Sequence, residues 1–376
     1  MMSDYILLTP GPLTTSQAVK ETMLNDWSTW DVDYNETTQW IRRELLRIAH
    51  VSEEDYTAVL IQGSGSYGIE SVINTGITAE DTILVLENGA YGRRMAQMAK
   101  GYGINTLELT FAEDQPVDAN QVAAFLELHP EVTHLGMVHL ETTTGILNPV
   151  SEVLVDAHER GIETIVDAMS SFGGMPIDVA AWNPSYLVSS ANKAIQGVPG
   201  FAFVIAKREV LNQHSTTARS LSLDLYDQNH EMDTHNGKWR FTSPTHVVYA
   251  FAKALEELRA EGGVAARYAR YANNQQKLER GMHALGFKTI LADDVQSPII
   301  TSYMFPTADF DFQRFYDYLK AKRFVIYPGK VSKLPTFRLG NIGEIYDADI
   351  DELLTAIAGY DILPIPVLAD FKTITD

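Results

Sequence analysis

The 376-residue chain contains no cysteine. This absence excludes disulfide bonds, thiolate metal sites and a cysteine nucleophile. The chain also has no apolar run long enough to cross a bilayer, and its first residues, MMSDYILLTPGP, lack the basic start of a signal peptide. We therefore expect a cytoplasmic protein with no membrane partner.

Basic side chains are few relative to acidic ones, 29 against 49, which gives a formal net charge of -20. Such a chain repels nucleic acid unless a local basic patch intervenes, and the sequence has none. The ten histidines show no H-E-x-x-H or other ligand spacing, so no metal is expected. No serine lies in a G-x-S-x-G setting, which argues against a serine hydrolase.

Short β-branched runs alternate with helical patterns from about residue 56 onward. The runs are YTAVLI, TILVLE, INTLELT, HLGMVHLE, IETIVD, YLVSS and FAFVIA. Between them, QVAAFLELH follows Asp118, and PVSEVLVDAHERG contains Ser151 and closes on Gly161; both have the period of amphipathic helices. The alternation predicts an α/β fold whose sheet is largely parallel and covered on both faces.

The alternation stops after FAFVIA, and a long helical pattern runs from Thr245 to about Leu285 with a break at Gly262-Gly263. Short strands and helices then resume. We expect an N-terminal arm over residues 1–20, a large α/β domain over 21–255 and a smaller α+β domain over 256–376. The tail LPIPVLADFKTITD is expected to be irregular at its start.

The first strand is followed by a glycine-rich loop, Gly63–Gly68. Ser64, Gly65 and Ser66 would direct N–H groups and hydroxyls toward an anion at the start of the next helix. A tight turn before a helix is the structural alternative. The spacing, together with Glu87, also fits a NAD-dependent oxidoreductase.

Two charged residues follow other strands of the expected sheet, where ligands collect in open α/β folds. Asp167 closes IETIVD, and Lys193 follows YLVSSAN. A carboxylate at the base of a cleft can keep a pyridinium nitrogen protonated, and a lysine whose pKa is lowered by burial and positive neighbours can form a Schiff base. Together they favour pyridoxal 5'-phosphate. Alternatively, Asp167 caps the next segment and Lys193 lies on the surface.

Tyr91 and Arg338 are further candidates. Tyr91, in ENGAYGRRM, offers an aromatic ring on which a cofactor could stack, or it is a half-buried tyrosine at a helix start. Arg338, in PTFRLGNIGE, could bind a carboxylate or phosphonate bidentately, or it is a structural arginine in a salt bridge.

Taken in order, a set of motifs resembles the class V, fold-type I aminotransferases, and within them the phosphonate transaminases. The motifs are LLTPGPLTTS, QGSGSYGIES, ENGAYGRRM, HLETTTGILNP, IVDAMSSFGGMPIDV, SSANKAIQGVPGFAFVIA and FRLGNIGE. The resemblance implies a large, mostly parallel-sheet domain that binds pyridoxal phosphate, a small α+β C-terminal domain and a homodimer with shared active sites.

The resemblance also implies roles for single residues. Lys193 is the Schiff-base lysine, Asp167 pairs with the pyridine nitrogen, and Tyr91, where many relatives have tryptophan, stacks on the ring. The remaining implied cofactor contacts are Ser64, Gly65 and Ser66 on the phosphate, Thr142 on the 3'-oxygen, Asn192 beside the lysine, and Thr242 of RFTSPTH from a second subunit.

For substrates, the resemblance implies that 2-aminoethylphosphonate and pyruvate are converted to phosphonoacetaldehyde and L-alanine, with Arg338 holding the acidic group. Trp27 and Trp30 of NDWSTWDVDY would line the pocket, or they anchor the N-terminal arm. Relatives that abstract sulfur need a cysteine, so that branch is excluded. An alanine:glyoxylate or serine:glyoxylate aminotransferase remains an alternative, as does the oxidoreductase; a non-catalytic phosphate-binding protein has no use for Asp167 and Lys193 together.

Overall fold

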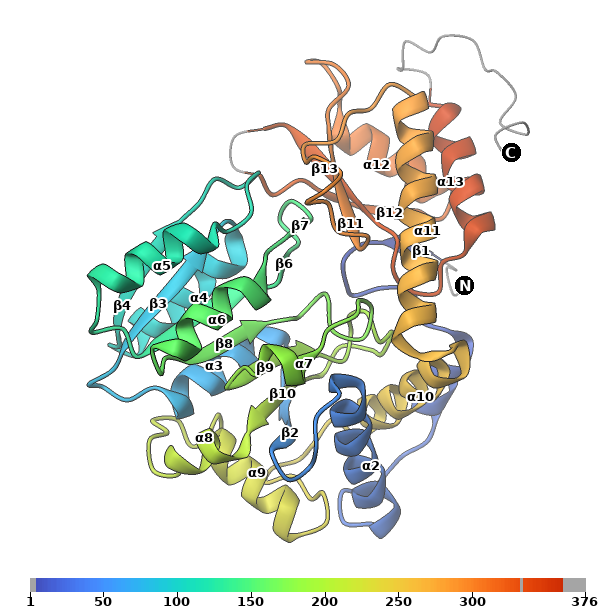
Figure 1. The fold of residues 1–376 in the computed structure, drawn as a ribbon. Helices are drawn as coiled ribbons and strands as arrows, with labels where there is room; N and C mark the ends of the chain where they lie inside the picture. The colour runs from blue at the N-terminus through green and yellow to red at the C-terminus, as the bar shows by residue number, and fades with distance from the viewer. Residues whose placement is uncertain (1–4, 332–333, 361–376) are drawn as a thin grey trace.

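A seven-stranded sheet and a four-stranded sheet organise the computed structural model, which describes residues 5–331 and 334–360 (Figure 1). The large sheet has the order β2-β10-β9-β8-β5-β3-β4. Its strands are β2 (Tyr56–Gln62), β3 (Thr82–Glu87), β4 (Asn105–Thr110), β5 (His134–Val138), β8 (Glu163–Asp167), β9 (Tyr186–Ser190) and β10 (Phe201–Lys207).

The expected parallel sheet is confirmed, and each β-branched run contributes a strand to it. Only β10 runs antiparallel to its neighbours, β9 and β2. The run HLGMVHLE was expected to form one strand, but it forms two. After β5 ends at Val138, β6 (Leu140–Glu141) pairs with β7 (Ile146–Leu147) in a separate two-stranded sheet.

Helices cover both faces of the large sheet because the side chains of each strand alternate between two cores. In β2, Ala58 and Leu60 join one core, and Val59 and Ile61 join the other. The first core includes buried residues of α2 (Val32–Ala49), α5 (Ala119–Leu128), α6 (Val150–Glu159), α7 (Val179–Trp182) and α10 (Thr245–Glu261). The second includes residues of α3 (Gly65–Gly76), α4 (Ala90–Gly101), α8 (Arg208–Gln213) and α9 (Leu225–Thr234).

The helix boundaries confirm most of the local predictions. Asp118 caps α5, since its side chain accepts from the N–H groups of Asn120 and Gln121. The break at Gly262-Gly263 separates α10 from α11 (Gly263–Ala284), and both glycines have positive φ. The second helical pattern forms α6, which begins at Val150 after Pro149, so Ser151 lies inside the helix.

The smaller sheet has the order β1-β12-β13-β11, and its first strand comes from the other end of the chain. β1 (Ile6–Leu8) lies in the expected N-terminal arm and pairs in parallel with β12 (Phe324–Pro328). β13 (Thr336–Gly340) pairs antiparallel with β12 and with β11 (Ile300–Met304). The N-terminal strand β1 is therefore an edge strand of the sheet that the C-terminal part of the chain forms.

The remaining elements are short or belong to the C-terminal region. They are α1 (Gln17–Glu21), a 3₁₀ helix (Thr22–Leu24), α12 (Phe312–Ala321) and α13 (Asp347–Ala358). The expected domain boundary at residue 255 falls inside α10 and stays a prediction, and the tail LPIPVLADFKTITD lies outside the described residues. Within residues 5–331 and 334–360, no helix is both long and apolar enough to cross a membrane.

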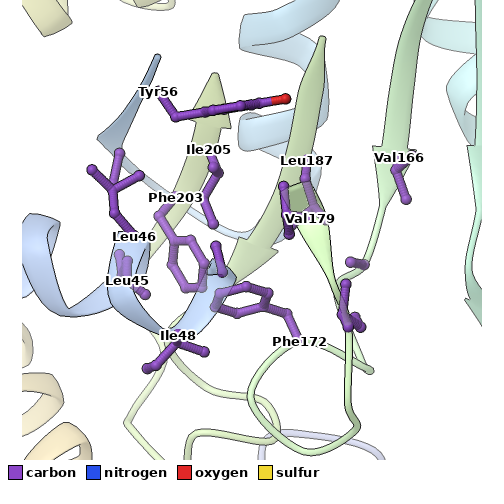
Figure 2. Packing of buried hydrophobic residues seen from close by; sticks show 14 of the residues in the cluster. Leu45, Leu46, Ile48, Tyr56, Val166, Phe172, Val179, Leu187, Phe203 and Ile205 are labelled. Carbon is purple, nitrogen blue, oxygen red and sulfur yellow. The ribbon is translucent and has the colours of Figure 1, made fainter. Parts of the chain in front are cut away.

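Phe203 on β10 is fully buried in the first core. Its ring meets Phe172 edge-on at a centroid distance of 5.5 Å, beside Leu45 and Ile48 of α2 (Figure 2). We predict that Phe203→Ala lowers the free energy of unfolding by about 3–5 kcal/mol, because it leaves a cavity that the β-sheet cannot close. Urea denaturation measures the effect. The exposed Leu128→Ala serves as control and should change stability by less than about 0.5 kcal/mol; equal effects would contradict the assignment of the core.

Candidate active site

A cavity of about 210 Å³ opens at the carboxyl ends of the parallel strands. It brings together most of the residues that the sequence singled out, from four separate segments of the chain. Those residues are Ser64, Gly65, Ser66, Tyr91, Asp167, Asn192 and Lys193. The cavity therefore lies where the strand ends converge, as the fold predicts.

One end of the cavity is built for an anion. Ser64 is the N-cap residue of α3, but its side chain makes no capping bond, so the first N–H groups of the helix and the hydroxyl face the same space. The guanidinium Nη1 of Arg94 lies 3.2 Å from Ser66 Oγ and adds a positive charge. Sequence reasoning missed Arg94; its position one helical turn after Tyr91 was the available signal.

The amine of Lys193 also lines the cavity and is held by backbone carbonyls. Its Nζ donates to Pro10 O at 3.0 Å and Gly11 O at 3.4 Å. Gly11 has φ +108°, and a Cβ there would lie 2.7 Å from Lys193 Cδ, so only glycine fits. The N-terminal TPGP segment is thus part of the site, which the sequence analysis did not predict.

Burial lowers the pKa of Lys193 to about 8, as expected for a reactive amine. The positive charges of Lys330 and Arg338 lower the pKa further, whereas the carboxylate of Asp167 raises it. A substantial fraction of this amine is therefore uncharged at mildly alkaline pH.

Asp167 is buried at the end of β8, beside the strand that leads to Lys193. Burial raises the pKa of Asp167 to about 6; the N–H of Met169, which donates to Oδ1 at 2.9 Å, opposes this rise. Negative charge on Glu141 adds to the rise, and Lys193 and Arg94 oppose it. A carboxylate in this setting gains most from a cationic partner placed in the cavity.

Tyr91 is positioned by the buried Glu141, a second residue that the sequence analysis did not assign. The preceding N-cap of α4, Gly89, has no side chain, and a Cβ there would lie 2.2 Å from the carboxyl carbon of Glu141. Glu141 accepts instead from the N–H of Tyr91 at 3.0 Å and of Thr143 at 3.1 Å. This carboxylate caps α4 from a distant strand and fixes the ring at the cavity.

Arg338 is buried on β13 without a carboxylate partner among the described residues, so the alternative of a salt-bridged structural arginine is wrong. Its Nη1 donates to Thr142 O at 2.7 Å and its Nε to Pro328 O at 3.1 Å. Thr142 is buried behind the cavity, and its contact with a cofactor stays a prediction. Negative charge on Glu141 acts on the guanidinium, but no carboxylate among the described residues forms an ion pair with it, so it can bind an acidic ligand.

The comparison with known proteins decides the family. The model of the aminotransferase class-V family matches residues 26–345. A protein from Lactiplantibacillus plantarum named 2-aminoethylphosphonate–pyruvate transaminase is 53% identical over 361 residues, which cover 96% of this chain and 99% of that protein. A protein of the same name from Bacteroides fragilis is 53% identical over 95% of this chain and 99% of its own length.

The chain belongs to the class V aminotransferases. Solved structures confirm the fold-type I architecture at lower identity. Pyridoxamine-pyruvate aminotransferase from Mesorhizobium loti superposes with a TM-score of 0.87 at 23% identity, covering 94% of this chain and 91% of that one. Alanine–glyoxylate aminotransferase from Nostoc sp. gives 0.87 at 22% identity, covering 94% of both.

The order of the strands contradicts the dinucleotide alternative. In that fold the acidic residue ends a strand next to the glycine-rich loop. Here Glu87 ends β3, and strands β10, β9, β8 and β5 lie between it and β2. Glu87 is buried beside Glu108, and this burial raises its pKa to about 7. Glu87 does not line the cavity.

Besides Thr142 and Arg338, three predicted residues do not line the cavity in the single chain. Trp27 stacks on Tyr249 at a centroid distance of 3.7 Å. This contact agrees with the alternative that Trp27 anchors the N-terminal arm. Trp30 is 79% exposed. Thr242 is also exposed, on the segment before α10. Their contacts with a cofactor or substrate stay predictions.

Potential metal ligands meet at one place in the described residues, far from this site. His134, Glu163 and His214 converge although they are distant in sequence, which is why no local spacing revealed them. Glu163 lies at the amino end of β8, opposite Asp167. His134 Nε2 is 3.0 Å from Gly76 O, and the acidic side chain lies between the two rings. The three side chains form a hydrogen-bond network, and the absence of a metal stays a prediction.

The lowered pKa of Lys193 yields a pH prediction for the protein without cofactor. The amine should react with an acylating reagent with half-maximal rate near pH 8, because burial favours its neutral form. In Asp167→Asn the midpoint should move to lower pH, since the charge that stabilises the ammonium is gone. Mass spectrometry of Lys193 against the exposed Lys322 provides the measurement and its control; equal midpoints for the two lysines would contradict the geometry.

Proposed function

We propose that this chain transfers the amino group of 2-aminoethylphosphonate to pyruvate, with pyridoxal 5'-phosphate as cofactor, and releases phosphonoacetaldehyde and L-alanine. The observation that carries the proposal is the cavity in which Lys193, Asp167 and the start of α3 converge. Two relatives that share 53% identity over nearly their whole length bear the name of this activity.

The donor set fits the cofactor. Ser64, Ser66 and Arg94 would hold a phosphate at the start of α3, Tyr91 would lie against the ring, and Asp167 would face the ring nitrogen. When bound, pyridoxal phosphate supplies an electron sink for charge that develops on the amine-bearing carbon. An ionised Asp167 is the residue that keeps a ring nitrogen protonated, and a cationic partner there favours ionisation of a carboxylate whose pKa burial has raised.

Lys193 is the residue that moves the proton. Its lowered pKa makes the amine available as a base near neutral pH, and it can return the proton once it is an ammonium. The carbonyls of Pro10 and Gly11 hold Nζ in the cavity and accept from the ammonium. Arg338, fixed by Thr142 O and Pro328 O, would bind the acidic group of each substrate and set its distance from the lysine.

We also infer that two copies of the chain form a homodimer in the cytoplasm and complete each other's site. Large apolar side chains are exposed in and near the segments that carry Trp30 and Thr242. Trp30 is 79% exposed, Leu221 71% and Phe241 51%. Phe241 adjoins Thr242, so a partner that covers this patch would bring Thr242 to a second cavity. This arrangement supports the proposed contact between Thr242 and the cofactor phosphate of the other subunit.

The experiment that tests the activity is an absorption spectrum of the protein loaded with pyridoxal phosphate. The yellow colour should fade on adding 2-aminoethylphosphonate alone and return with pyruvate as alanine forms. Lys193→Ala should lower turnover by about 10²–10⁴-fold, since the base is removed. Loss of colour with alanine or serine and glyoxylate, but not with the phosphonate, would assign the chain to a different aminotransferase activity.

The shared site gives a separate prediction. Thr242→Ala should weaken binding of pyridoxal phosphate about fivefold, which is the effect of losing one hydrogen bond, without changing the sedimentation coefficient. Thr216→Ala, at another exposed threonine, is the matched control. Fluorescence titration of the cofactor measures both variants. An unchanged affinity in Thr242→Ala, or a monomer in the wild-type protein, would contradict the shared site.

A further inference from the structure

The cavity concentrates positive charge in an acidic protein. Acidic side chains exceed basic ones by 20, and basic residues elsewhere pair with them, as Arg93 does with Glu113 at 2.8 Å. Within the described residues, no ion pair involves Arg94, Lys193, Lys330 or Arg338. The buried carboxylates of Asp167 and Glu141 act on three of these cations, but the four cations outnumber the two carboxylates, so net positive charge remains for anions that enter from solvent.

Two of these cations already have a task. Arg94 lies against Ser66 at the phosphate end, and Lys193 is the amine that moves the proton. Arg338 carries a single charge, and two of its five N–H groups are taken by Thr142 O and Pro328 O. It can neutralise a carboxylate, but only half of a phosphonate that carries two negative charges.

Lys330 is placed to supply the second charge. It is exposed just after β12, and its Nζ lies 5.6 Å from the centre of the Tyr91 ring, on the hairpin that also carries Arg338. That hairpin is tightly held: Gly329 N donates to Thr336 O at 2.9 Å, and a Cβ on Gly329 would lie 2.1 Å from Thr336 Oγ1. The backbone therefore fixes where Lys330 begins relative to Arg338, and the Lys330 amine lies over the ring of Tyr91, which lines the cavity.

We propose that Lys330 is a specificity-determining residue that binds the donor's phosphonate together with Arg338 and favours dianionic phosphonates over monoanionic carboxylates. This inference rests on the proposed function. Because the carboxylate of pyruvate or alanine is satisfied by Arg338, Lys330 matters in the half of the reaction that begins with the phosphonate.

The test measures binding of two ligands that lack an amine, ethylphosphonate and propionate, to the protein loaded with pyridoxal phosphate. Lys330→Gln should weaken the binding of ethylphosphonate about tenfold at pH 8, because one partly exposed positive charge is removed. The affinity for propionate should not change. Lys330→Arg should restore most of the affinity. Lys322→Gln is the matched control, because Lys322 also lies over a tyrosine ring, 5.1 Å from the centre of Tyr318, but away from the cavity.

The pH dependence separates a charge effect from a change in shape. As the pH falls, the phosphonate dianion takes up one proton and becomes a monoanion. The difference in affinity between wild type and Lys330→Gln should therefore shrink as the pH is lowered through the second pKa of ethylphosphonate. In turnover, kcat/KM for 2-aminoethylphosphonate should fall about tenfold while kcat/KM for alanine is unchanged.

If Lys330→Gln weakened binding of ethylphosphonate and propionate equally, or weakened binding of neither, the inference would be overturned. The proposed function would still hold if the wild-type protein transferred the amino group of 2-aminoethylphosphonate. A wild-type protein that binds no phosphonate and uses only amino-acid donors would overturn both.

Discussion

Burial of one amine and one carboxylate at the ends of neighbouring strands is the constraint on which the rest of the structure depends. Asp167 ends β8 and Lys193 follows β9, and the two strands pair in parallel, so both groups reach the same cavity. Each is removed from water, and burial shifts the pKa of each toward the neutral form. The surrounding sheet must be rigid enough to keep water out and the two groups in place.

The chain meets this constraint with backbone groups and distant side chains. The carbonyls of Pro10 and Gly11 accept from Lys193, which explains why the N-terminal strand β1 is tied to the C-terminal sheet next to the cavity. Glu141 caps the helix that bears Tyr91. In a protein of net charge -20, the cations in and near this cavity outnumber the carboxylates that act on them, so anionic ligands are attracted locally although the surface as a whole repels them.

The strands and the central site residues could be predicted from the sequence because parallel strands bring their carboxyl ends to one edge. A residue after a β-branched run, such as Asp167 or Ser64, is therefore placed by the fold itself. Arg94, Glu141 and the TPGP segment were missed because their roles arise from contacts between segments far apart in the chain. Ser151 lies inside α6 because the helix begins at Val150, after the N-cap residue Pro149. Thr242, Trp27 and Trp30 cannot be placed at a site by one chain alone.

Exchange of the hydrogen on the amine-bearing carbon of 2-aminoethylphosphonate in D₂O, followed by NMR without pyruvate, tests the central claim most directly. If Lys193 is the base, the protein loaded with pyridoxal phosphate incorporates deuterium at that carbon. Lys193→Gln, which can still fill the same space, should then lose exchange by about 10²–10⁴-fold while cofactor binding persists. Undiminished exchange in Lys193→Gln, with the cofactor bound, would contradict the assignment of the buried amine as the group that moves the proton.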